Sequence, residues 1–212
     1  MHVPDGIVPP SVAIAGYALT GGMTWYSLRQ IDHDPQATAK MPKASLLTAA
    51  FFVASLIHIP IPPSSVHLVL NGLVGIVLGY FAFPAIAIGL FFQAVFFQHG
   101  GLSTLGINAA MMGIPAVGAY YTFQLRERLG RSQRLQQVLA FGAGAGALAT
   151  SALVFTVLIV TTVPAELNAQ LEQTATLIAL GGYAVQAVIE GLFTVMLVSF
   201  FQRVKPELLE ES

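Results

Sequence analysis

The chain has 212 residues, of which 55% are apolar and only 9% are charged, a composition typical of a membrane protein with several spans. Its formal net charge of −1 offers no basic surface for nucleic acid. The absence of cysteine excludes disulfides, thiolate metal sites and cysteine nucleophiles, so that any metal must be held by nitrogen or oxygen. We therefore expect one all-α transmembrane domain over residues 1–212.

The apolar runs predict a polytopic bundle of about seven transmembrane helices, because a helix needs roughly 20 residues to cross a bilayer. The run 68–98 is too long for one crossing, and Pro84 is the expected break. The sequence leaves open whether 68–98 forms two full spans or a re-entrant hairpin, and both options give the same sidedness downstream. The predicted helices are 11–29, 44–60, 68–83, 84–98, 105–124, 136–162 and 173–202.

The nine lysines and arginines fall in three groups, which the predicted spans place on one side of the membrane. Because Lys and Arg are enriched in short cytoplasmic loops, we expect the N-terminus outside and the C-terminus in the cytoplasm of a cell (inner or plasma) membrane. No basic residue precedes Arg29, so we expect no cleaved signal peptide. The nine are Arg29, Lys40, Lys43, Arg126, Arg128, Arg131, Arg134, Arg203 and Lys205.

Small residues one helical turn apart let helices approach closely in lipid. We expect the pairs Gly75/Gly79 and Gly142/Gly146 to pack in this way. The loop RERLGRSQR at 126–134 is expected to be a solvated cytoplasmic loop, with docking to a partner as the alternative. No Gly-Lys pair occurs, so the chain has no Walker A motif and does not hydrolyse ATP by that route.

The opening MHVPDGIVPP places a histidine directly after the first residue. The α-amine of Met1, the amide nitrogen of His2 and its Nδ1 can form fused five- and six-membered chelate rings with one metal ion. A fourth nitrogen, from His67, would complete a square plane, which Ni(II) and Cu(II) favour; Co(II) could also be held. We expect residues 1–10 to be a metal-binding segment, and an incidental terminal histidine remains the alternative.

Polar residues near the external ends and inside the last span are candidates for a supporting role. Glu190 lies near the middle of a predicted span, where a carboxylate is costly and usually functional, although a structural hydrogen bond is the other reading. Asp5 could orient the His2 ring through the nitrogen not used for metal. The candidates around the metal ligands are Asp5, Asn71, His99, Asn108 and Glu190.

Four segments resemble the CbiM/NikM family, the substrate-binding (S) components of cobalt and nickel energy-coupling-factor (ECF) transporters. They are MHVPDGIVPP, SSVHLVLNGLVGIVLG, FFQHGGLSTLGINAAMMGI and VIEGLFTVMLVSFFQRVKPELL. The resemblance implies a metal bound by the Met1 amine, the His2 amide and side chain, and the His67 side chain. It also implies an extra first span, which lets the N-terminus enter the bundle from outside.

The chain departs from this family in two places. An acidic residue commonly precedes the paired glycines, where this chain has Gln98-His99, so His99 could assist capture. Some members have a histidine in the last span, where this chain has Gln186 or a neighbour.

The resemblance implies a capture subunit of an ECF-type ABC importer, with Co²⁺ or Ni²⁺ as transported substrate, no organic cofactor and no enzyme activity of its own. The implied partners are a transmembrane coupling (T) subunit, ATP-binding cassette ATPase subunits and a small accessory membrane subunit. One alternative is an intramembrane metalloenzyme that uses His67, His99 and Glu190, although no HExxH motif occurs. A metal-independent channel or scaffold is the other. The sequence does not separate cobalt from nickel.

Overall fold

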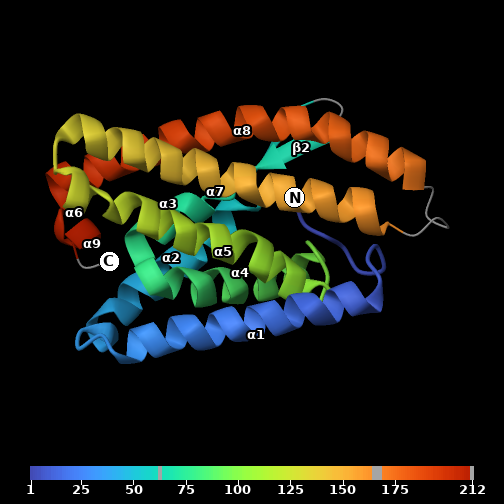
Figure 1. Ribbon diagram of the computed structural model, residues 1–212, viewed down its shortest axis with the longest axis horizontal. Helices are drawn as coiled ribbons and strands as arrows, with labels where there is room; N and C mark the ends of the chain where they lie inside the picture. Colours follow the sequence, from blue (N-terminus) through green and yellow to red (C-terminus); the bar gives the residue numbers. More distant parts are fainter. Residues whose placement is uncertain (62–63, 164–168, 211–212) are drawn as a thin grey trace.

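The computed structural model describes residues 1–61, 64–163 and 169–210 (Figure 1). A two-stranded antiparallel hairpin, β1 (His58–Ile61) and β2 (Ser64–His67), stands between the second and third helices. A 3₁₀ turn, η1 (Gly79–Phe81), joins the third and fourth. The helices are α1 (Pro10–Asp32), α2 (Ala37–Ala54), α3 (Asn71–Leu78), α4 (Ala82–Phe97), α5 (Leu105–Gln124), α6 (Arg126–Leu129), α7 (Gln133–Thr162), α8 (Ala169–Val204) and α9 (Glu207–Glu210).

The long helices lie side by side in an elongated bundle (Figure 1). Helix α5 contacts α1, α3, α4 and α7, while α8 lies along α7 and also contacts β2. The expected helical bundle is therefore confirmed, with the hairpin as its exception. By length and composition, three stretches of the described helices could cross a membrane: Asn71–Phe97, Gln133–Thr162 and Gln173–Val204.

The second predicted helix, 44–60, is wrong at its C-terminal end. Helix α2 ends at Ala54, and the chain continues as the β hairpin, in which His58 faces His67 across the two strands. The physical reason lies in HIPIPPSSVH: proline lacks the N–H of the helical ladder, and β-branched residues favour strands. The second and third of these prolines, at 62–63, lie outside the described residues.

The run 68–98 reverses direction, as three contacts with α5 demonstrate. An added Cβ on Gly75 would meet Ala116, the Tyr80 hydroxyl bonds that of Tyr121, and an added Cβ on Gly113 would meet Phe83. The path thus runs toward the end of α5 and back again. The reversal falls at η1, before the predicted break at Pro84, which lies in the first turn of α4.

Helix α3 forms the short first arm of this helical hairpin. With eight residues, it is about 12 Å long at 1.5 Å per residue, so it does not form the full span predicted at 68–83. The run 68–98 thus forms a helical hairpin with one short arm, and the number of membrane crossings that it makes stays a prediction. Strand β2 lies beside α8, and α3 lies beside α5 and α7 (Figure 1).

Small residues allow close helix contacts, although not all at the predicted positions. A Cβ added to Gly75 would lie 2.0 Å from the Ala116 carbonyl oxygen, so Gly75 packs as expected. A Cβ added to Gly142 or Gly146, by contrast, would meet no atom of another described element within 4 Å. The residue between them, Gly144, makes the close approach, since an added Cβ would lie 2.4 Å from Oγ1 of Thr194.

The C-terminal helix α9 returns to the end of the bundle that carries the basic residues (Figure 1). Arg126 Nη2 donates to the Leu209 carbonyl at 2.7 Å, and Lys43 Nζ donates to that of Leu208 at 3.3 Å. Arg126 is buried. The loop 126–134 is therefore not solvated throughout, because its first arginine holds the C-terminal helix.

Candidate metal centre

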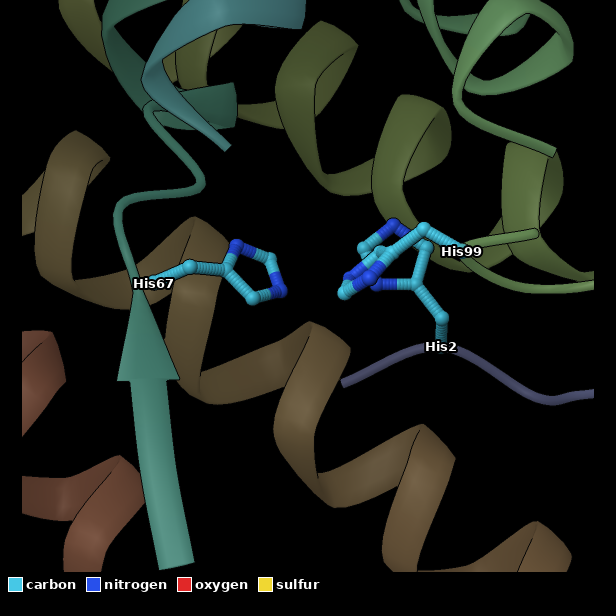
Figure 2. A group of neighbouring side chains, drawn as sticks. All are labelled: His2, His67 and His99. Atoms are coloured by element: carbon cyan, nitrogen blue, oxygen red, sulfur yellow. The ribbon is translucent and has the colours of Figure 1, made fainter. Parts of the chain in front are cut away.

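Three imidazoles converge inside the bundle, from the N-terminal segment, the end of β2 and the loop after α4 (Figure 2). The ring centroid of His2 lies 5.1 Å from that of His67 and 4.2 Å from that of His99. One ligand nitrogen from each ring lies within 4.8 Å of the other two. Since metal–nitrogen bonds are about 2.0–2.1 Å, small side-chain adjustments would let all three rings reach a single ion.

The N-terminal segment enters the bundle without helical structure, and its position is fixed at Val3. The Val3 amide donates to Asn108 Oδ1 at 2.9 Å, and Asn108 Nδ2 donates back to the Val3 carbonyl at 3.0 Å. The same carbonyl accepts from Thr104 Oγ1 at 2.6 Å. Because both main-chain groups of Val3 are bonded to α5 or its N-cap, the adjacent His2 is held in place.

Asp5 fixes the same segment but does not reach the imidazole as the sequence had suggested. Its carboxylate accepts from the amides of Leu102 and Ser103, at 3.2 and 2.9 Å, and from the Ser103 hydroxyl at 2.5 Å. These bonds, that of the hydroxyl above all, lower the pKa of Asp5. Asp5 therefore binds the N–H and O–H groups that precede α5, and not the His2 ring.

The paired glycines allow the loop 98–104 to lie against the N-terminal segment. A Cβ on Gly101 would stand 2.7 Å from the Asp5 amide nitrogen, and one on Gly100 would stand 3.1 Å from Asn108 Nδ2. Gly100 also has φ +87°, which favours glycine. This close approach places His99, the preceding residue, beside His2.

The partner of the His2 ring is Gln93 of α4, a residue that the sequence analysis missed. Its Oε1 lies 3.0 Å from His2 Nε2. A carbonyl oxygen can only accept, so Nε2 carries the proton and Nδ1 keeps its lone pair. In the described part of the chain, the buried Nδ1 has no hydrogen-bond partner. The sequence signal was a single glutamine in the apolar stretch LFFQAVFF.

At the end of β2, a hydrogen bond also determines which nitrogen of His67 carries the proton. Its Nδ1 lies 3.3 Å from the Leu68 carbonyl oxygen, which makes Nδ1 the protonated nitrogen and leaves the lone pair on Nε2. The residue is buried. Figure 2 shows its ring directed toward those of His2 and His99.

The N-terminal amine completes a set of uncharged nitrogen donors. Burial lowers the pKa of the Met1 α-amine to about 5, so the amine is unprotonated at neutral pH. Burial above all, and then the repulsion that protonated forms of the amine and of the other two imidazoles would exert, also lowers the pKa of His2. Such neutral, buried lone pairs suit a transition-metal cation, because ligand nitrogens must be deprotonated to bind it.

Two other candidate residues bind protein groups instead of pointing into the cluster. Asn71 donates through Nδ2 to the Met112 carbonyl and to Ser151 Oγ, and so ties α3 to α5 and α7. Glu190 accepts from the amides of Val69 and Leu70, just beyond His67.

Comparison with known proteins identifies the chain's relatives. The family model CbiM, described as the cobalt uptake substrate-specific transmembrane region, matches residues 2–208. A Haemophilus influenzae protein named for metal transport is 39% identical over 148 residues, covering 70% of this chain and 68% of that protein. The fused nickel transport protein NikMN of Rhodobacter capsulatus is 32% identical over 161 residues, covering 73% of this chain and 46% of the fused protein. This chain thus spans about half the length of that relative.

A solved structure has the same fold. It is titled as the crystal structure of a transition metal transporter, and it superimposes with a TM-score of 0.75 at 19% identity, covering 96% of this chain and 93% of the other. At this identity the likeness establishes the fold alone. Since the family model matches nearly the whole chain, the chain belongs to the CbiM family of cobalt and nickel transport components.

Proposed function

We propose that the chain captures Co²⁺ or Ni²⁺ as the substrate-binding membrane component of an ECF-type ABC importer. The observation that carries this proposal is the convergence of three imidazoles beside a buried N-terminal amine, in a chain of the CbiM family. The metal ion is the transported substrate, and the chain does not convert it chemically. A T subunit, ATPase subunits and a small accessory membrane subunit complete the importer.

The proposed ligands are the Met1 amine, the His2 amide nitrogen, His2 Nδ1 and the Nε2 of His67. The orphaned Nδ1 of His2 supports this set, because a buried polar atom without a partner is costly unless a ligand binds it. His99 offers a fifth nitrogen beside these four. We expect His99→Ala to weaken metal binding less than His67→Ala does, since four planar nitrogens would remain.

The metalloenzyme alternative would use Glu190 together with His67 and His99. The carboxyl group of Glu190 instead binds protein groups, since it accepts from the amides of Val69 and Leu70 and from Gln186 Nε2.

Equilibrium titration of the purified, detergent-solubilised chain with Ni²⁺ and Co²⁺ tests the function. One tightly bound ion per chain, with Mg²⁺ unable to compete, is the expected result, because nitrogen donors prefer the later transition metals. No binding of either ion would reject the capture function. Competition between the two ions in the same experiment gives the preference.

The end of the bundle that carries the loop 98–104 would face the outside of the cell membrane, and the basic end would face the cytoplasm. The one-sided distribution of Lys and Arg supports this orientation. Because the natural chain has no cysteine, Leu102→Cys and Leu129→Cys can be compared without background. Both side chains are exposed. An impermeant thiol reagent should label intact cells at position 102 and not at 129; the reverse pattern would overturn the orientation.

A further inference from the structure

Residues 68–70, which follow His67 and link β2 to α3, have no regular secondary structure. Leu70 has a left-handed backbone, with φ 56° and ψ 15°, which costs a non-glycine residue about 1 kcal/mol or more. A metal ligand at the start of such a segment needs an external support. The structure places that support on α8, about 120 residues further along the chain.

Two side chains of α8, one helical turn apart, bind three main-chain groups of residues 67–70. Gln186 Nε2 donates to the His67 carbonyl at 2.5 Å. Glu190 Oε1 accepts from the Val69 amide at 2.5 Å. The other oxygen, Oε2, accepts from the Leu70 amide at 2.9 Å.

The two supporting side chains also bind each other, since Gln186 Nε2 lies 3.3 Å from Glu190 Oε1. They are almost completely buried, at 3% and 1% exposure. Because buried hydrogen-bonding groups are costly to leave without a partner, these contacts fix the main chain that follows His67. The direction of the His67 ring therefore depends on α8.

The other half of the metal site is held by different helices. Asn108 and Thr104 fix Val3 from α5 and its N-cap, and Gln93 of α4 binds the His2 ring. The main neighbours of α8 are α7, β2 and α9. A displacement of α8 relative to α4 and α5 would thus move His67 relative to His2, while Asn71, which ties the start of α3 to α5 and α7, would limit that movement.

We propose that Glu190 and Gln186 are positioning residues for His67, and that they make metal affinity depend on the position of α8. This inference rests on the proposed function, since it assigns these residues to the same site. Helix α8 passes β2 and continues to the basic end of the bundle (Figure 1). A partner that shifts α8 from that end would lower the affinity and release the ion.

The first test is Glu190→Gln. The amide oxygen of glutamine can accept one of the two main-chain N–H groups, but its NH₂ group then faces the other. We expect about 10-fold weaker Ni²⁺ binding in the folded protein, within the range typical of groups that orient metal ligands. At saturating Ni²⁺ the absorption spectrum should match that of the wild type, because the ligands are unchanged. Thr194→Ala, one turn further along α8 and also buried, is the control and should bind as the wild type does.

A double-mutant cycle separates positioning from general stability. If Glu190 acts through His67, then Glu190→Gln should change Ni²⁺ affinity by less than about 2-fold once His67 is already alanine. An undiminished effect in the His67→Ala background would overturn the inference. Wild-type affinity in the folded Glu190→Gln protein would also overturn it.

A second variant keeps the test decisive if Glu190→Gln does not fold. Gln186→Met preserves side-chain length and removes the donor to the His67 carbonyl and to Glu190, and we expect Ni²⁺ binding roughly 3-fold weaker. Unchanged affinity in this variant would reject the role of Gln186. Failure of the wild-type chain itself to bind Ni²⁺ and Co²⁺ would overturn the proposed function together with this inference, whereas a binding wild type with insensitive variants overturns the inference alone.

Discussion

The N-terminal segment and the segment after β2 each bring one histidine to the metal centre, but they are anchored differently. Neutral groups of α4 and α5 hold the first, at the main chain of Val3 and at the ring of His2. A carboxylate and an amide of α8 hold the second at the main chain of residues 67–70, and Asn71 ties the helix that follows to α5 and α7. The two halves of the site thus belong to different parts of the bundle.

This division shows how a buried site can bind tightly and still open. If one helix held all ligands, release of the ion would require local unfolding. With two anchors, a relative movement of packed helices is sufficient, and such movements need no loss of secondary structure. The following predictions remove or weaken each anchor in turn.

The largest expected effect comes from adding one residue before Met1. The amine of Met1 becomes an amide, and the new amine cannot take its place because Asn108 and Thr104 hold the main chain of Val3. We expect Ni²⁺ and Co²⁺ affinity to fall roughly 100-fold or more, since the chelate loses one of its nitrogens. Calorimetry or radiometal binding on the folded variant measures this. The same residue added after Ser212 is the control, and full affinity in the N-terminally extended protein would exclude the amine as a ligand.

Removal of His67, the ligand at the end of β2, should have the next largest effect on metal affinity. We expect His67→Ala to weaken Ni²⁺ binding about 10-fold or more, because one of the four proposed metal bonds is lost and the rigid N-terminal chelate remains. The matched control is His33→Ala, since His33 follows the end of α1 at the basic end of the bundle. Equal affinities in the two variants would contradict the proposed site.

The sequence predicted helices whose limits are marked by a change in local composition. Helix α5 begins and ends where it was predicted, at 105 and 124, because a long apolar run stands there between a glycine-rich and an arginine-rich segment. The hairpin at 58–67 was missed, since its strands have four residues each and continue an apolar stretch. A break within 68–98 was predicted from the length of that run, but it falls at η1 and not at Pro84, and α3 is shorter than the predicted helix 68–83.

The residues of the candidate site also divide into those that the sequence predicted and those that it missed. Met1, His2 and His67 could be proposed from the chemistry of a terminal chelate and from the family resemblance, and the structure places them together. Gln93 could not be proposed, because it meets His2 across 91 positions of sequence. Asp5 was assigned to the wrong partner, since the free amides at Leu102 and Ser103 become its neighbours only in the folded chain.

A smaller effect is expected when the N-terminal anchor is loosened with every metal ligand intact. Asn108→Ala removes both hydrogen bonds to Val3, one at its amide and one at its carbonyl. We expect roughly 5-fold weaker Ni²⁺ binding, because a buried amide is left unsatisfied and His2 gains freedom. Thr122→Ala, half-buried near the other end of the same helix, is the control for α5. Titration of both variants checks the difference, and unchanged affinity in Asn108→Ala would show that Val3 is held by other contacts.

The smallest effect concerns which nitrogen of His2 carries the proton. Gln93→Leu removes the acceptor for Nε2–H, and so removes the contact that keeps the lone pair on Nδ1. The loss is partly offset, because the buried Nε2 of Gln93 itself has no hydrogen-bond partner among the described residues. We therefore expect only about 3-fold weaker Ni²⁺ binding, close to the value of one neutral hydrogen bond. Nitrogen chemical shifts of the His2 ring, measured by NMR in the metal-free protein, provide the second readout: the wild type should be protonated at Nε2, and the variant should be a mixture of both tautomers. Gln36→Leu, exposed at the far end of the bundle, should change neither the shifts nor the affinity. A single Nε2-protonated form in Gln93→Leu would show that the metal-binding tautomer is set by the position of the His2 ring and not by Gln93.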